Sequence, residues 1–119
     1  MFLVLWEFEV KLGREQRFEL VYGPGGDWDS LFSNDPNHAG TRLFRDTAGI
    51  GVYLTADYWL SRKSYEEFLT LRRIGYTTLD AATEDLTLNE RHIGSFETAE
   101  AMINCEPTAR PGHRRRDRV

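Results

Sequence analysis

The chain has 119 residues and a formal net charge of −4, with 40% hydrophobic and 13% aromatic residues. This length and composition predict one globular domain that buries a core without covalent staples. No apolar run reaches the roughly 20 residues that a membrane-spanning helix needs, so we expect no membrane association. The single cysteine, Cys105, excludes an intramolecular disulfide and favours a cytoplasmic protein.

Charge is unevenly distributed along the chain. Residues 107–119 contain five arginines and one aspartate, so the preceding part of the chain is strongly acidic. An acidic body argues against nucleic-acid binding by the domain itself. We therefore expect a folded domain over residues 1–98 and a basic, disordered tail over residues 99–119. Salt-sensitive nucleic-acid binding through this tail is the least favoured role.

The first predicted element is a strand over residues 2–10. Its alternation places Val4, Trp6 and Phe8 on one face. The segment lacks a basic leader and carries two glutamates, so we interpret it as a strand rather than a signal peptide. A helix over residues 14–22 follows.

Three glycines and a proline at residues 23–26 interrupt the helical pattern. A phosphate-binding loop would follow a strand and lead into a lysine, serine or threonine. Here a helix comes first, and Asp27, Trp28 and Asp29 follow. We therefore predict a bend, with Asp27 as the N-cap of a second short helix and Trp28 anchoring it to the core.

The remaining elements alternate between strands and one long helix. Strands over residues 40–46 and 50–59 form a predicted antiparallel hairpin. Ser61 can cap a helix over residues 62–86, which carries a stripe of apolar residues at helical spacing. A last strand is predicted over residues 89–97.

This order predicts an α+β, ferredoxin-like βαββαβ fold with a four-stranded antiparallel sheet. Helices would cover one face of the sheet only. The other face carries apolar side chains and needs a cover, so we expect a homodimer in which two sheets meet.

Four segments carry a resemblance to a known family, namely LVLWEFEVKLGREQRFELVYGPGGDWDSLF, GTRLFRD, YLTADYWLSRKSYEEF and HIGSFE. They are similar to the antibiotic biosynthesis monooxygenase domain over about residues 2–97. The most specific piece is Tyr58-Trp59 followed by Ser61 and the stretch from Tyr65 to Phe68. The resemblance implies a dimeric α/β barrel.

The resemblance also implies a choice of activities. Some relatives oxidise aromatic polyketide phenols with molecular oxygen and without a cofactor, others degrade haem, and many have no known activity. The haem-degrading members use an axial histidine on the long helix. Residues 61–86 contain no histidine, so we expect no haem and no other cofactor.

The third predicted strand supplies three candidate site residues. Tyr53, Asp57 and Trp59 share one face by their spacing. Tyr53 and Trp59 are predicted walls of a ligand cavity, although aromatic residues at such positions also serve as core or interface packing. Asp57 is a candidate general base, with an exposed strand-end charge as the alternative.

The long helix and the last strand supply three more candidates. Arg72 lies on the apolar stripe of the helix, where it either anchors an anionic or phenolate ligand beside Tyr76 or extends to solvent. His92 is a candidate general base because imidazole titrates near neutral pH, with a structural or surface histidine as the alternative. The three histidines, His38, His92 and His113, lie far apart in sequence, so no metal site is predicted.

Two functions are therefore open. The first is a cofactor-independent monooxygenase that acts on a small aromatic or polyketide-like substrate in a cavity between the sheet and the long helix. Substrate deprotonation by His92 or Asp57 would precede the reaction with oxygen. The alternative is a dimeric protein that binds a small ligand, or fills its own interior, without oxygenase chemistry.

Overall fold

The computed structural model describes residues 1–100. It contains the following elements in chain order: β1 (Phe2–Val10), α1 (Glu15–Tyr22), α2 (Asp27–Phe32), β2 (His38–Arg45), β3 (Val52–Trp59), α3 (Arg62–Leu71), α4 (Arg73–Thr83), the short 3-10 helix η1 (Glu84–Leu86) and β4 (Thr87–Glu97). The four strands form one sheet in the order β2-β3-β1-β4. Each neighbouring pair is antiparallel.

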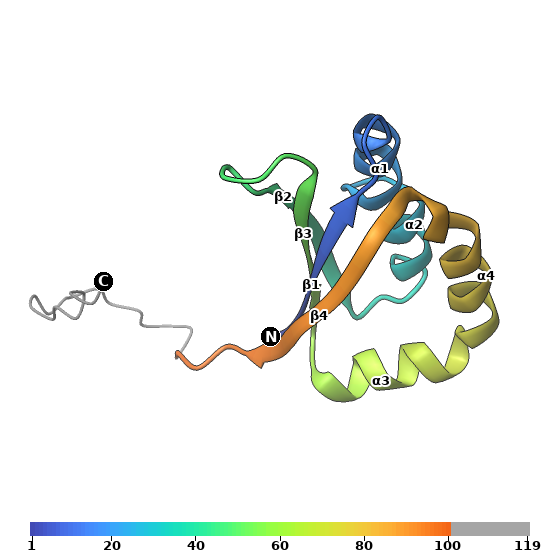
Figure 1. Cartoon of the computed structure of the whole chain (residues 1–119). Helices are drawn as coiled ribbons and strands as arrows, with labels where there is room; N and C mark the ends of the chain where they lie inside the picture. The colour runs from blue at the N-terminus through green and yellow to red at the C-terminus, as the bar shows by residue number, and fades with distance from the viewer. Residues whose placement is uncertain (101–119) are drawn as a thin grey trace, which may run out of the picture.

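This topology confirms the predicted ferredoxin-like fold. β1 lies inside the sheet and pairs with β3 on one side and β4 on the other, so that Phe2 faces both Trp59 and Glu97 across the ladders. Figure 1 shows the helices gathered on one side of the sheet. Side chains alternate along each strand, and this arrangement therefore separates a covered face from an open one.

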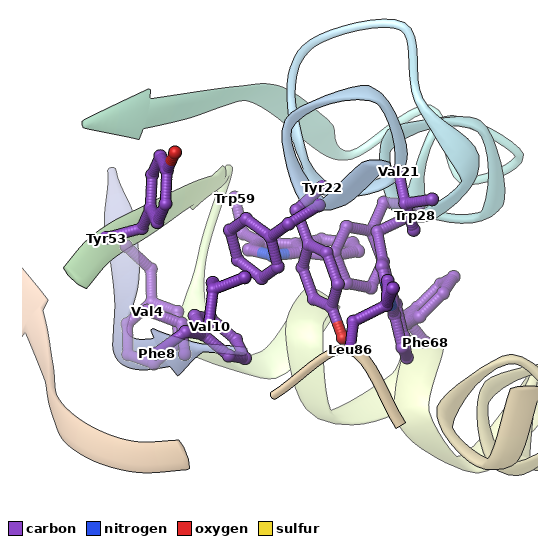
Figure 2. Packing of buried hydrophobic residues seen from close by; sticks show 13 residues of the cluster. Val4, Phe8, Val10, Val21, Tyr22, Trp28, Tyr53, Trp59, Phe68 and Leu86 are labelled. Atoms are coloured by element: carbon purple, nitrogen blue, oxygen red, sulfur yellow. The ribbon is translucent and has the colours of Figure 1, made fainter. Parts of the chain in front are cut away.

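The core lies between the covered face and the helices. Figure 2 shows how its side chains from the sheet and from α1, α2 and α3 interdigitate. The largest fully buried residues are Trp59, Phe18, Phe68 and Val21. Full burial of each such apolar side chain stabilises the fold by about 1.5–3 kcal/mol.

The glycine-rich stretch is a bend between α1 and α2. Gly25 has φ +82°, in the left-handed region that favours glycine. A side chain on Gly26 would lie 2.3 Å from the carbonyl oxygen of Leu20. The structure corrects the predicted cap: Gly26, not Asp27, is the N-cap of α2, and Asp29 instead accepts a 2.7 Å hydrogen bond from the Gly25 amide. Trp28 is buried, as predicted.

The long helix that the sequence predicted is two helices. The break falls at Arg72, whose backbone (φ −111°, ψ 26°) leaves the helical range and ends α3. Figure 1 shows the corner that results. Gly75, just after the break, lets α4 approach α2 closely, because an added side chain would lie 3.3 Å from Leu31. The corner thus turns the second half of the stripe towards α2.

Other boundaries shift by small amounts. β2 starts at His38, two residues before the predicted strand, and β4 starts at Thr87. Ser61 caps α3 as predicted, in a reciprocal capping box with Ser64. The predicted tail beyond residue 100, with Cys105 and His113, lies outside the described residues. Within residues 1–100, no helix has the length and apolar character to cross a bilayer.

The open face of the sheet carries apolar residues from all four strands. They are Leu3, Leu5, Phe44, Leu54, Ala56, Tyr58 and Phe96. Several are cross-strand neighbours, since Leu3 faces Tyr58 and Phe96, and Phe44 faces Leu54. Phe44 and Phe96 are 40% and 48% exposed. Within residues 1–100, no helix covers this face.

Candidate functional site

A cavity of about 150 Å³ lies between the covered face of the sheet and the helices. Residues from every strand and from all four α-helices contribute to its lining, which comprises Val4, Trp6, Phe8, Tyr22, Trp28, Phe32, Thr41, Thr55, Asp57, Tyr65, Tyr76, Asp80 and Glu90. Seven of these side chains are aromatic. The cavity is therefore an aromatic box with a small number of polar groups, which is the usual composition of a small-ligand site.

The helical walls result from the bend and the corner described above. The bend at residues 23–26 brings Trp28 over the sheet, and the corner at Arg72 brings Tyr76 of α4 against it. The rings of Trp28 and Tyr76 meet edge-on with centroids 5.0 Å apart. Two helix interruptions thus produce one continuous wall.

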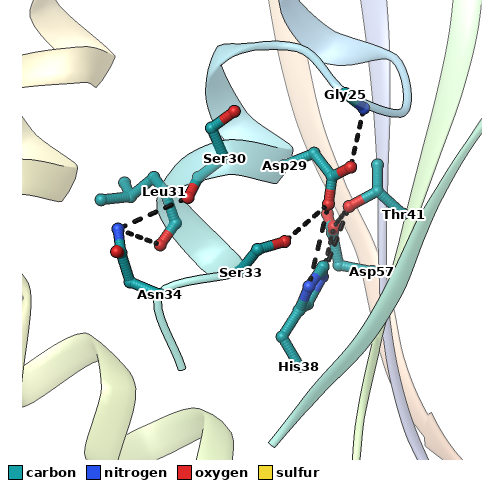
Figure 3. A network of polar contacts seen from close by, with 9 residues as sticks. All are labelled: Gly25, Asp29, Ser30, Leu31, Ser33, Asn34, His38, Thr41 and Asp57. Atoms are coloured by element: carbon teal, nitrogen blue, oxygen red, sulfur yellow. Dashed lines mark hydrogen bonds and ion pairs between the residues drawn. The ribbon is translucent and has the colours of Figure 1, made fainter. Parts of the chain in front are cut away.

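A polar network on β2 and β3 enters the cavity at Asp57 (Figure 3). Thr41 donates a 2.6 Å hydrogen bond to Oδ1 of Asp57, and Nε2 of His38 lies 3.4 Å from the same oxygen. The other ring nitrogen of His38 lies 3.9 Å from Oδ1 of Asp29 on α2. The His38 side chain is only 2% exposed and that of Asp57 is 14% exposed. An imidazole thus bridges two carboxylates beneath the cavity.

Sequence reasoning missed His38 as a site residue, because it precedes the strand predicted over residues 40–46. The turn-forming run at residues 34–37 hid the start of β2, and a β-irregularity between His38 and Gly40 breaks the simple alternation. The sequence feature that could have pointed to His38 is its short spacing from Thr41. Both side chains contact Asp57 in the structure. Pairing of His38 with Trp59 across the ladder accounts for its burial.

A second group of carboxylates lies on the other side of β1. Glu90 of β4 faces Phe8 across the ladder, and Asp80 of α4 follows Tyr76 by one helical turn. Burial raises the pKa of the Glu90 carboxyl, and the negative charges of Asp80 and Glu84 raise it further, while a 3.1 Å hydrogen bond from Thr87 lowers it. Within residues 1–100, neither Asp80 nor Glu90 has a basic side chain as an ion-pair partner.

The tyrosine hydroxyls of the cavity are held neutral. Burial raises the pKa of Tyr76 strongly, and the neighbouring Tyr65, Asp80, Glu90 and Asp57 add to this effect. Burial also raises the pKa of Tyr65, with a further contribution from the Asp57 charge. Both phenols therefore act as hydrogen-bond donors or acceptors rather than as anions.

The structure brings together only two of the six predicted site residues. Asp57 and Tyr76 line the cavity. Trp59 is fully buried in the core behind it, and Tyr53 instead donates a hydrogen bond to Glu19. Arg72 is exposed at the helix corner. His92 is exposed on β4, with its ring 5.2 Å from that of Trp6.

The chemistry that the site can support follows from its groups. Asp57 is a carboxylate at a cavity wall with a hydrogen-bond donor fixed on one oxygen, so it can accept a proton from a bound molecule. The aromatic walls exclude water and present π-faces to a ring or a cation. Among residues 1–100, no group of three histidine, cysteine or acidic side chains is arranged to hold a metal ion.

Comparison with solved structures identifies similar folds. SnoaB, described as a cofactor-independent oxygenase from Streptomyces nogalater, is 19% identical, with a TM-score of 0.68 over 86% of this chain and 96% of that one. A protein assigned to the antibiotic biosynthesis monooxygenases from Deinococcus radiodurans is 14% identical, with a TM-score of 0.66 over the same shares. One from Bordetella bronchiseptica is 15% identical, with a TM-score of 0.67 over 83% of this chain and 97% of that one.

No family model matches the chain, and no curated protein matches its sequence. The structural likeness nevertheless spans most of the described residues and nearly the whole of each neighbour. The resemblance predicted from the sequence is thus confirmed at the level of architecture, and this chain has the fold of the antibiotic biosynthesis monooxygenases.

Proposed function

We propose that the chain is a cofactor-independent monooxygenase of the antibiotic biosynthesis type that acts on a small aromatic substrate. The observation that carries this proposal is Asp57, a carboxylate held by Thr41 and His38 at the wall of an aromatic cavity. The fold similarity to a cofactor-independent oxygenase supports it.

In the proposed reaction, Asp57 accepts a proton from an activated C–H or O–H group of the substrate. The resulting anion gives one electron to molecular oxygen, and the two radicals combine to a peroxide. Where the substrate carbon is a CH₂ group, loss of water leaves a carbonyl, so one oxygen atom is retained and the other leaves as water. The proton on Asp57 returns during this loss.

The contributions of the protein would be positioning and desolvation. Thr41 and His38 fix the carboxylate by contacts to Oδ1, which leaves Oδ2 for the substrate. Aromatic walls orient a planar ring and exclude water, which protects the anion from reprotonation. His92 is exposed, so we assign the proton transfer to Asp57 rather than to His92.

One observation favours the alternative, a ligand-binding protein without oxygenase chemistry. The pKa values of Tyr65 and Tyr76 are raised in the cavity. The same surroundings oppose ionisation of a bound phenol, so a substrate must carry a more acidic proton or bring its own positive charge. A protein that only binds its ligand has no such requirement.

The test is oxygen uptake with a panel of single-ring phenols. We expect wild-type protein to exceed the buffer rate, and Asp57→Asn to lose at least about 100-fold, since the general base is removed while the shape is kept. Glu66→Gln, on the exposed face of α3, is the matched control and should retain full activity. Wild-type rates equal to buffer across the panel would overturn the proposal in favour of the binding protein.

We also propose that the chain is a homodimer that pairs through the open face of the sheet. The apolar cross-strand pairs on that face support this, because exposed apolar patches of this kind are found at interfaces. In light scattering after size exclusion, the wild type should run at twice the chain mass and Leu54→Arg at the chain mass. A wild-type monomer at micromolar concentration would contradict the proposal.

A further inference from the structure

We infer that the cavity selects a small aromatic ligand that carries a positively charged nitrogen. This inference rests on the proposed function only in that it names the ligand class of the same site. Three independent features support it: the sign of the charges at the cavity, its size, and an unpaired indole N–H in its wall.

The first feature is the charge of the lining. Among the described residues that line the cavity, Asp57, Asp80 and Glu90 are acidic, and none is lysine, arginine or histidine. Among residues 1–100, His38 is the basic side chain in polar contact with this group of carboxylates, and it contacts only Asp57. Burial and the nearby charge of Asp80 raise the pKa of Glu90, and a bound cation would relieve this repulsion.

The aromatic walls add to the preference for a cation. Rings of Trp6, Tyr22, Trp28, Tyr65 and Tyr76 line the same cavity. The faces of such rings attract ammonium groups, most strongly for tryptophan and when the cation is desolvated. An anionic ligand would be repelled by both the negative ring faces and the carboxylates. This lining therefore favours a cationic ligand over an anionic one. Arg72, the predicted anion anchor, lies outside the cavity and does not offset this discrimination.

The second feature is size. A cavity of about 150 Å³ is comparable to one that accommodates a benzene-sized molecule. One aromatic ring fits this space, whereas a fused tricyclic system does not fit without movement of the walls. A short aliphatic arm can place a charged nitrogen beside Asp80 and Glu90, whose residues are more exposed than those of the aromatic walls.

The third feature is the indole of Trp28. Its side chain forms part of the cavity wall and the residue is 7% exposed. Within residues 1–100, Nε1 makes no hydrogen bond of good geometry, and the polar group near it is the Tyr22 hydroxyl, which donates to Thr83. A buried N–H donor without an acceptor is costly, and a ligand oxygen would satisfy it. The ligand class is therefore a single ring that carries an oxygen substituent and an ammonium group, as in a phenolic amine.

Three probes of similar shape and different charge test this inference. They are tyramine (cationic), 4-(2-hydroxyethyl)phenol (neutral) and 4-hydroxyphenylacetate (anionic). Binding is measured by calorimetry and by tryptophan fluorescence under nitrogen, so that no oxygenation takes part. We expect tyramine to bind about tenfold more tightly than the neutral probe, and the anionic probe to bind most weakly.

Variants assign the preference to the proposed groups. Glu90→Gln and Asp80→Asn should each reduce the affinity for tyramine about threefold to tenfold and leave that of the neutral probe unchanged. Glu66→Gln should change neither affinity. Trp28→Phe, which removes the indole N–H and a tryptophan face, should weaken tyramine and the neutral probe, and tyramine more, provided that its circular dichroism spectrum matches the wild type.

Equal binding of the three probes, tighter binding of the anion, or binding of none of them would overturn the inference. These outcomes are separable from the oxygenase proposal. Oxygenation of single-ring phenols without a preference for tyramine would leave the proposed function standing and contradict the proposed ligand class. A tyramine preference without any oxygen uptake would support the proposed ligand class and contradict the proposed oxygenase function.

Discussion

The hydroxyl of Tyr53 donates a 2.6 Å hydrogen bond to Oε2 of Glu19 and so joins β3 to α1. We predict that Tyr53→Phe destabilises the protein by about 1 kcal/mol at neutral pH, measured by urea denaturation, because one partly buried hydrogen bond is lost. Ligand affinity should not change, since Tyr53 lies outside the lining of the cavity. A loss of affinity with unchanged stability would instead indicate a role in ligand binding.

The same contact predicts a pH dependence. The hydrogen bond from Tyr53, together with that from Arg45, lowers the pKa of Glu19 below its ordinary value of 4.5. A carboxyl with a lowered pKa stabilises the folded state at neutral pH, and this contribution is lost as the pH falls through the folded-state pKa. The difference in stability between wild type and Tyr53→Phe should therefore be largest at neutral pH and shrink in acid below 4.5.

Gly26 and Gly25 should respond differently to alanine substitution. A Cβ at Gly26 would lie 2.3 Å from the Leu20 carbonyl oxygen and 2.6 Å from that of Val21, so the backbone itself must move. We predict a loss of about 2–3 kcal/mol for Gly26→Ala. Gly25→Ala meets no neighbour within 4 Å and is disfavoured only by its φ of +82°, by about 1–2 kcal/mol. Equal losses in urea denaturation would contradict this account of the bend.

Trp59 provides a test of core packing. It is fully buried, and its indole Nε1 has no hydrogen-bond partner within residues 1–100. Trp59→Phe therefore breaks no described hydrogen bond and should lower the free energy of unfolding by about 1–2 kcal/mol. Trp59→Ala should lower it by about 3–5 kcal/mol. If the phenylalanine variant loses as much stability as the alanine variant, the indole must make a polar contact that this packing lacks.

Glu90 should show the opposite pH dependence to Glu19. Burial and neighbouring negative charges raise its pKa above 4.5 in the folded state. A carboxyl with a raised pKa favours folding when it is protonated, and this contribution is lost as the pH rises through the folded-state pKa. Glu90→Gln should therefore be slightly more stable than wild type at neutral pH, and the gain should disappear below 4.5. A gain that persists in acid would exclude charge as its cause.

The fold was predictable from the sequence because its main signals are local. Alternation in β1 and β3, the glycines at residues 23–26 and the cap at Ser61 each act over a few residues. The helix corner was not predictable, because the apolar stripe continues past Arg72 and only the close approach of Gly75 to Leu31 distinguishes two helices from one.

The candidate site was predictable only in part. Asp57 and Tyr76 were found because each lies on an element with a regular alternation of apolar and polar residues. This alternation does not distinguish a residue in the cavity wall from one in the core behind it, as the buried Trp59 and Tyr53 show. His38 was missed because its burial depends on pairing with Trp59 across the sheet, at a strand start that a turn-rich segment conceals. Contacts between residues distant in sequence were therefore beyond local patterns.

Every strand and every α-helix contributes a side chain to the cavity. A molecule held there is in contact with the whole domain, so it cannot remain bound once any one layer separates. Because such a ligand binds only the folded state, it stabilises that state by about 2.7 kcal/mol when its free concentration is about one hundred times Kd. Melting-temperature shifts across a chemical library can accordingly reveal the natural ligand even while its reaction is still unidentified.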